Sequence, residues 1–223
     1  MFHKKVRKHR KERDTGGVVQ QVNRELAERE ARLAALTGDK YTELMAEGTR
    51  YASQHDTRRA AKAYRAAIAL RPDKPSAYFN LGAALTNSGH YVEAAQWYLE
   101  AKERSLASSE DWAQATSLAF NMLVQKECAE VAKPEWWNDE GLQALSARVV
   151  TAAPNRVTTN HMRAVILSGL SGAWEARPPS SAELAEAAAH YERAAALCTA
   201  PVQKADLAAR AYACRLAVAH GTQ

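Results

Sequence analysis

Apolar residues recur every three or four positions along almost the whole chain after residue 17. Val18, Val22 and Leu26 follow this spacing in the first segment, and Leu44 and Tyr51 follow it in the next. The spacing places one apolar face along an α-helix, whereas a half-buried strand alternates apolar and polar residues at every second position. No segment alternates convincingly, so the pattern predicts an all-α protein.

Turn signals divide this helical pattern into segments. Only ten glycines and seven prolines interrupt a chain rich in Ala, Leu, Glu, Arg and Gln, which are the residues that lose least on entering a helix. The predicted turns fall at residues 56, 71–73, 88–89, 105–108, 153–155 and 177–180. We therefore expect a first helix over residues 17–36 and a last helix over residues 202–220.

Residues 41–106 contain an internal repeat with a period of 34 residues. Six pairs of positions separated by this interval keep their residue class: Leu44 and Tyr78, Gly48 and Gly82, Tyr51 and Leu85, Ala60 and Ala94, Tyr64 and Tyr98, Ala67 and Ala101. The pattern resembles the tetratricopeptide repeat, a helix–turn–helix unit of this length. Small residues such as Gly48 and Ala60 let the two helices of a unit cross closely, while the aromatic residues fill the space around the crossing.

The resemblance continues beyond residue 106 with divergent units. Trp112 is in phase with the repeat, a fourth unit is expected from residue 157, and insertions are expected around residues 133–139 and 172–180. The resemblance implies a right-handed α-solenoid of helix hairpins over residues 17–223, with an N-terminal helix before it and a C-terminal helix that caps its open end.

Positive charge is concentrated at the start of the chain. The formal net charge is +5, and the remaining 210 residues after residue 13 hold 23 basic and 24 acidic side chains. We expect residues 1–16 to form a basic disordered tail. Its seven cationic residues are Lys4, Lys5, Arg7, Lys8, Arg10, Lys11 and Arg13.

Such a tail has four interpretations, which the sequence leaves open. The tail could bind nucleic-acid phosphates, or serve as a nuclear localisation signal or a mitochondrial presequence. The fourth interpretation is a solvated segment with little function. No stretch approaches the roughly 18 apolar residues that span a membrane, and the start is not a secretory signal. We expect an intracellular protein, cytoplasmic or nuclear, with a mitochondrial location as the alternative.

The three cysteines, Cys128, Cys198 and Cys214, are expected to be buried thiols in a reducing compartment.

The sequence shows no constellation of residues that catalysis would need. Nucleotide-binding and hydrolase motifs are missing, and no histidine stands four residues from another histidine or a cysteine. We predict a non-enzymatic protein without metal or cofactor.

In the insertion around residues 133–139, Trp137 is interpreted as part of the cap of the helix that follows Asn138, and Trp136 fits either this role or an exposed anchor for a partner. Ser180 and Glu183 have the spacing of a capping box.

In the tetratricopeptide family, the first helix of each unit lines a concave groove that binds ligands. Carried over by the resemblance, the groove residues are Met45, Thr49, Phe79, Asn80, Ala83, Asn87, Ala113, Ser117, Phe120 and Asn121, with His161 and Val165 as extensions. We expect Phe79 to face solvent there. The alternative is that the N-terminal helix, with Val18, Val22 and Leu26, folds back over Phe79.

The expected partner is a peptide or helix of another protein, held in the groove by an adaptor or scaffold. The chaperone-binding members of the family hold a terminal carboxylate in a clamp of two Lys, two Asn and an Arg. The matching positions here are Met45, Thr49, Asn80, Glu110 and Gln114, of which only Asn80 agrees. A carboxylate would meet Glu110 without compensating cations, so chaperone tails are not expected partners. The alternative function is a nucleoprotein component that the tail anchors to RNA or DNA.

Overall fold

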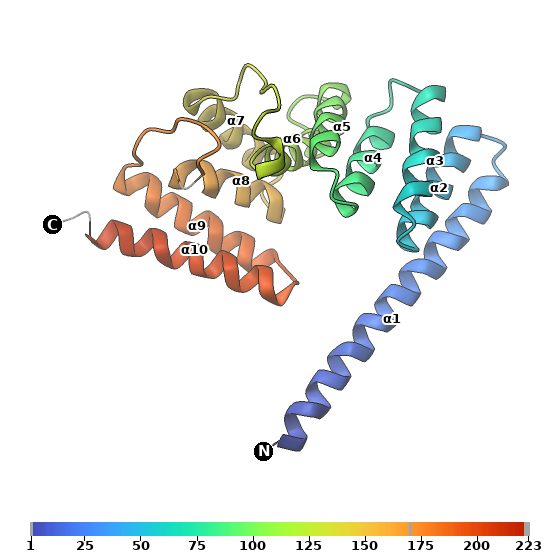
Figure 1. The fold of residues 1–223 in the computed structure, drawn as a ribbon, viewed down its shortest axis with the longest axis horizontal. Coiled ribbons are helices and arrows are strands. Elements are labelled where there is room, and N and C mark those ends of the chain that lie inside the picture. Colours follow the sequence, from blue (N-terminus) through green and yellow to red (C-terminus); the bar gives the residue numbers. More distant parts are fainter. Residues whose placement is uncertain (1, 170, 221–223) are drawn as a thin grey trace. The chain divides into compact units, whose positions relative to one another are not determined.

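The structure, a computed structural model, describes the backbone of residues 2–169 and 171–220 and the side chains of residues 17, 19–169 and 171–220. Over this part of the chain the fold is all-α, without strands, which confirms the predicted class. The elements are α1 (Phe2–Ala35), α2 (Lys40–Ser53), α3 (Thr57–Leu70), α4 (Pro75–Asn87), α5 (Tyr91–Arg104), α6 (Glu110–Leu123), the short 3-10 helix η1 (Lys126–Cys128), α7 (Asp139–Ala152), α8 (Val157–Ser168), α9 (Ser181–Leu197) and α10 (Pro201–His220) (Figure 1).

The chain forms two compact units, which are described separately below. Unit 1 is Met1–Gly89 and holds α1 to α4, whereas unit 2 is His90–Gln223 and holds α5 to α10. The division falls in the turn between α4 and α5, where Gly89 adopts the left-handed conformation with φ 78°. These two helices are the halves of the second predicted repeat. The predicted boundaries at residues 1–16 and 17–223 stay predictions.

In unit 1, helix α1 forms a hairpin with the shorter α2 and extends beyond it (Figure 1). It begins at Phe2 rather than near residue 17. Its Ala27 and Ala34 are 5% exposed, whereas Val22 and Leu26 are 46% and 50% exposed. Small residues therefore make the buried face of α1. The alternative in which Val22 and Leu26 fold back over Phe79 stays a prediction, and the side chain of Val18 lies outside the described residues.

Helices α2 and α3 form the first predicted repeat. The side chains of Asp39 and Asp56 cap their N-termini by accepting hydrogen bonds from backbone N–H groups. Where the helices cross, a methyl group on Gly48 would lie 2.5 Å from the ring of Tyr64, which is 3% exposed. The repeat thus needs its glycine because an aromatic ring of the second helix lies directly against the first.

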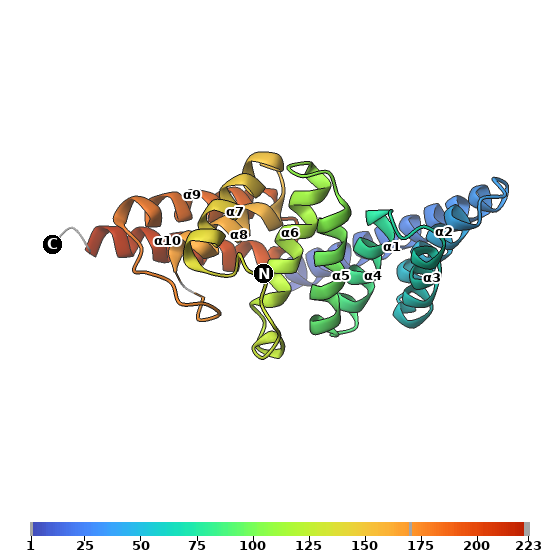
Figure 2. The same ribbon diagram turned by 90° about the horizontal axis from the view of Figure 1, so that it is seen from above.

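Unit 2 contains packed helices where the sequence predicted divergent repeats. Helices α6 and α7 pack together, as do α8 and α9, and α10 packs on α9 as the last helix. The insertions form the irregular segments before α7 and before α9, and the latter, over residues 171–180, is the loop that leads into α9 (Figure 2). The core is continuous through Trp112, Leu142, Val149 and Tyr191, each at most 5% exposed.

Local caps position the helices that follow these insertions. Asn138 Oδ1 accepts a hydrogen bond from Gly141 N at 2.9 Å, and Ser180 with Glu183 forms the predicted capping box at the start of α9. Cys128, Cys198 and Cys214 are buried free thiols, as predicted. Within the described part of the chain, no helix is both long and apolar enough to cross a membrane.

Candidate functional site

Six of the predicted groove residues lie on α2 and α4, the first helices of the first two repeats, which contact each other within unit 1. We call them the α2–α4 face: Met45, Thr49, Phe79, Asn80, Ala83 and Asn87. Five are half-buried and Asn87 is exposed. Phe79 is therefore partly covered rather than open to solvent as expected. No member of the face carries a charge.

The polar groups on α2 are held by its own packing. The hydroxyl of Thr49 donates to the carbonyl oxygen of Met45 at 3.0 Å, and its oxygen lies 3.3 Å from the hydroxyl oxygen of Tyr64. Burial raises the pKa of the Tyr64 phenol above its ordinary value, so the ring stays neutral. The α2 side of the face therefore consists of neutral groups in fixed positions.

On α4, Asn80, Ala83 and Asn87 follow one another at intervals of three and four residues. This spacing places them along one side of the helix, about 10 Å from end to end. Each amide offers one acceptor oxygen and two N–H donors. Because Ala83 is small, a polypeptide backbone can approach α4 between the two amides.

The structure corrects three predicted groove residues in unit 2. Ala113, Ser117 and Phe120 are 0% exposed, so they cannot line an open surface. The cause is the packing of α8 against α6, where Ser117 Oγ donates to Thr158 Oγ1 at 3.0 Å. Asn121, the fourth groove residue predicted on α6, is half-buried.

The two proposed extensions on α8 also belong to the interior of unit 2. His161 is half-buried, its Nδ1 lies 3.3 Å from Asn121 Oδ1, and Val165 is 7% exposed. Burial, helped by the nearby cation of Arg210, holds the pKa of His161 below its ordinary value. The imidazole is thus neutral near pH 7 and acts as a packed polar group.

An aromatic cluster closes over Phe120. The ring centroids of Trp137 and Trp174 lie 5.6 and 5.9 Å from that of Phe120, and Trp137 Nε1 donates to the carbonyl oxygen of Ala173 at 3.1 Å. The two insertions therefore meet through their tryptophans, which supports the structural interpretation of Trp137. Trp136 is half-buried, with its ring centroid 5.8 Å from that of Trp137.

Gly141 is a position that sequence reasoning missed. A methyl group there would lie 2.6 Å from the backbone oxygen of Trp136, so the insertion can fold against α7 only over a glycine. The signal available in the sequence is the placement of a glycine, a poor helix former, in the first turn of a capped helix. It fixes the path of the Trp136–Trp137 segment.

The position that would face a carboxylate ligand is already paired. Glu110 Oε1 accepts a hydrogen bond from Arg156 Nε at 2.6 Å. The expectation that no cation would compensate Glu110 is therefore wrong, and the prediction that chaperone tails are not partners stays a prediction. The seven cationic residues of the tail fall within the bounds of α1, but their side chains lie outside the described residues, so their role stays a prediction as well.

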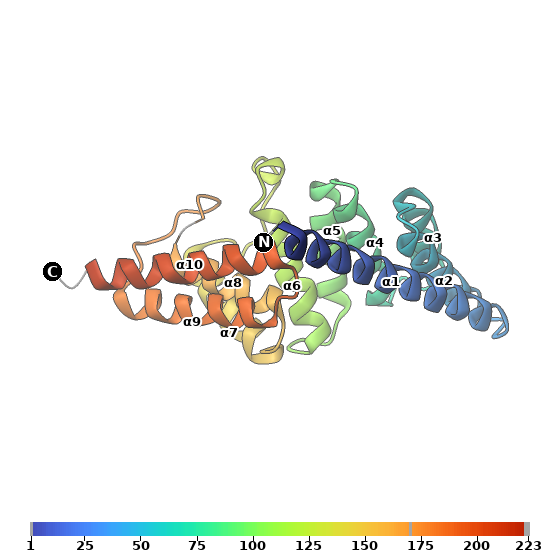
Figure 3. The same ribbon diagram turned by 90° about the horizontal axis from the view of Figure 1, so that it is seen from below.

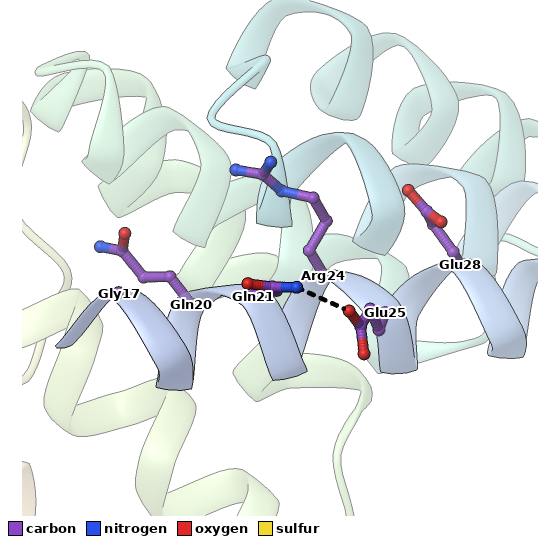
Figure 4. Close-up of a pocket in the computed structure, with 6 residues that line it drawn as sticks. All are labelled: Gly17, Gln20, Gln21, Arg24, Glu25 and Glu28. Carbon is purple, nitrogen blue, oxygen red and sulfur yellow. Dashed lines mark hydrogen bonds between the residues drawn. The ribbon is translucent and has the colours of Figure 1, made fainter. Parts of the chain in front are cut away.

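A shallow cleft of about 400 Å³ runs along one side of α1 (Figure 4). Its lining is Gly17, Gln20, Gln21, Arg24, Glu25 and Glu28. Gln21 Nε2 donates to Glu25 Oε1 at 3.1 Å, while Gln20, Arg24 and Glu28 point to the same side of the helix. All lining residues come from a single helix, and they include one cation and two carboxylates. The cleft is therefore a polar surface rather than an enclosed site. Among the described residues, no group of three or more His, Cys, Asp or Glu side chains is arranged to hold a metal.

Residues 45–110 match the family model of the tetratricopeptide repeat. The match covers less than a third of the chain and coincides with the two repeats read from the sequence, which confirms that resemblance. No curated protein matches the chain. Tetratricopeptide repeats generally mediate protein–protein interaction and are generally non-enzymatic scaffolds.

Proposed function

We propose that this protein is a non-enzymatic adaptor that binds a peptide or helix of another protein on the α2–α4 face. The observation that carries the proposal is the uncharged character of this face, which spans the neighbouring first helices of two matched repeats. First helices of consecutive units form the ligand surface in this repeat class. On α6, the predicted groove residues Ala113, Ser117 and Phe120 are buried and take no part.

The chemistry of the face indicates the kind of ligand it accepts. Asn80 and Asn87 can exchange hydrogen bonds with peptide groups of a bound backbone, because each amide both donates and accepts. Ala83 leaves room for that backbone, and Met45 offers an adaptable apolar contact. A neutral or apolar segment therefore suits the face better than a terminal carboxylate, which would find no cation among these six residues.

The test replaces an alanine by glutamate at two different positions. Ala83→Glu places a charge in the middle of the face, whereas Ala69→Glu places the same charge on an exposed position of α3. The probes are peptides enriched from a displayed library of random 15-residue sequences on the full-length protein, and fluorescence anisotropy measures their Kd. We expect Ala83→Glu to weaken binding at least about tenfold, or 1.4 kcal/mol, and Ala69→Glu to leave it unchanged.

Two outcomes would count against the adaptor proposal. One is equal binding by both variants, with circular dichroism showing that both are folded. The other is a library from which no peptide binds better than its scrambled version. Asn80→Ala gives an independent measurement, because it removes one amide without adding charge, and a loss of about three- to tenfold is expected.

A further inference from the structure

Helix α10 has two apolar faces. The helix lies along α9 (Figure 3). Its inner face carries Leu207, Ala211 and Cys214, each 2% exposed. The other face carries Val202 at 85%, Tyr212 at 64% and Leu216 at 40% exposure. A helix that is apolar on both sides is typical of an interior position, so the exposed apolar face of α10 calls for a partner surface.

The exposed residues form a continuous seam. We call it the outer stripe of α10: Val202, Ala205, Ala209, Tyr212 and Leu216. The intervals alternate between three and four residues, which is the spacing of the contact positions in helices that pair side by side. The five side chains thus line up on the side of α10 that points away from Leu207 and Cys214.

Two arginines of α10, Arg210 and Arg215, lie beside the stripe and are paired within the same chain. Arg210 Nε contacts Asp206 Oδ2 at 2.8 Å, and Arg215 Nη2 contacts Glu192 Oε1 at 2.5 Å. Each of these two cations is neutralised by a carboxylate of its own subunit, and Lys204, three residues before Leu207, lies on the side of the helix away from the stripe. Two such stripes can therefore approach each other without bringing unpaired like charges together.

From these observations we propose that the outer stripe is a homodimer interface, in which α10 pairs antiparallel with α10 of a second copy. A two-fold interface must be complementary to itself. When two copies of the stripe run antiparallel with residue 209 opposite residue 212, each large side chain faces an alanine. Tyr212 of one copy then packs on Ala209 of the other, and Leu216 packs on Ala205.

The parallel arrangement fits less well because identical residues would face each other. Two Tyr212 rings would crowd one layer, while paired alanines would leave gaps in the layers of residues 205 and 209. The antiparallel register distributes volume evenly along the seam. A single helix pair also buries less than the standard interface of about 1,600 Å², so the expected dimer is weak and dissociates in the micromolar range.

Sedimentation velocity of the full-length protein, from about 1 to about 200 µM, tests the proposal. We expect a shift from monomer to dimer over this range. Ala209→Glu, on the stripe, should move the midpoint at least tenfold upward, whereas Ala217→Glu, an exposed position of α10 beside the stripe, should leave it in place. Circular dichroism should show that both variants are folded. If Ala209→Glu unfolds, Tyr212→Ala replaces it and should raise the midpoint about threefold or more.

The register is tested by disulfide formation between variants. When Ala205→Cys and Leu216→Cys proteins are mixed and oxidised, the antiparallel seam predicts a cross-link between the two variants. Neither variant should cross-link with itself, because the like positions would stand about 16 Å apart along the helix axis. The wild type, with three buried cysteines, measures the background.

Three results would overturn the proposal. The first is a wild type that stays monomeric up to the highest concentration, which would mean that the stripe is covered by something other than a second copy. The second is a dimer that Ala209→Glu and Ala217→Glu weaken equally. The third is efficient cross-linking of Leu216→Cys with itself, which would indicate a parallel pair.

Discussion

Gly48 and Gly141 are positions where the absence of a side chain decides the local packing. The first lies against the ring of Tyr64, and the second lies against the backbone of Trp136. Gly48 was recognisable from the sequence because Gly82 repeats it one period later. Gly141 has no such counterpart, since its neighbour Trp136 belongs to an insertion outside the repeat.

Gly48→Ala should destabilise the protein. The added methyl group would stand 2.5 Å from Cε1 of Tyr64, a ring that is almost fully buried and can move only by disturbing α3. Overpacking of this kind costs about 1 to 3 kcal/mol. Chemical denaturation monitored by circular dichroism measures the loss.

The matched control for this prediction is Gly17→Ala. Both glycines lie within helices, so both substitutions gain the same helix propensity, but nothing lies within 4 Å of the methyl group at position 17. The difference between the two variants isolates the clash. Equal unfolding free energies of the Gly48→Ala and Gly17→Ala variants would mean that the crossing of α2 and α3 is looser than described.

At the scale of the element, an ionic cap joins the segment before α9 to the first turn of that helix. Glu183 accepts hydrogen bonds from Ser180 N at 2.8 Å and from Ser180 Oγ at 2.7 Å, and it pairs with Arg177. The guanidinium of Arg177 and these donors lower the pKa of Glu183 to about 2. The cap therefore ties the end of the insertion to the first turn of the helix.

This cap predicts a defined pH dependence of stability. A carboxyl group whose pKa is depressed in the folded state contributes stability above its unfolded pKa of about 4.3, and the contribution is lost as pH falls toward the folded pKa near 2. Glu183→Gln keeps a side-chain oxygen that can accept the hydrogen bond of the capping box but removes the charge. We expect the variant to be less stable than the wild type at pH 7, with the gap closing between pH 4.5 and pH 2.

Thermal melts of both proteins across this range provide the measurement. Glu192→Gln on the same helix is the comparison, because its partner Arg215 lies on α10 rather than at a helix cap. A gap between wild type and Glu183→Gln that stays constant down to pH 2 would show that the charge of Glu183 does not stabilise the cap.

At the scale of the whole molecule, the main features are two compact units and an uneven charge distribution. Seven cations lie within residues 1–13, and the rest of the chain is nearly neutral. This contrast separates the adaptor function from the nucleoprotein alternative. A polyanion would be bound by the tail alone, whereas a peptide would be bound by the α2–α4 face whether or not the tail is present.

If the tail neutralises phosphates, binding of the full-length protein to single-stranded RNA should weaken steeply with salt. Each phosphate contributes a slope of about −0.7 to the plot of log affinity against log salt concentration, so seven contacts would give about −5. Deleting residues 1–13 should abolish the binding, and filter binding of an oligouridine probe measures it. Lys62→Gln, an exposed position on α3, should leave the slope unchanged. RNA binding that persists without the tail would contradict this assignment.

The sequence by itself determined the features that act over short distances. Helix type, the caps at Asn138 and Ser180, the 34-residue repeat and the places of the insertions all depend on residues within a few turns or at a regular interval. Periodicity and capping chemistry are local, so they can be read in one pass along the chain.

Only the tertiary structure decided which positions remain accessible. Ala83 and Ser117 occupy equivalent places on first helices, one 34-residue period apart, yet Ser117 is fully buried and Ala83 is half-buried. The difference arises from contacts between distant residues, such as Ser117 with Thr158 and Trp137 with Ala173, and from insertions that have no counterpart in the repeat. Burial depends on what another segment places over a residue, and no local pattern along the chain encodes that.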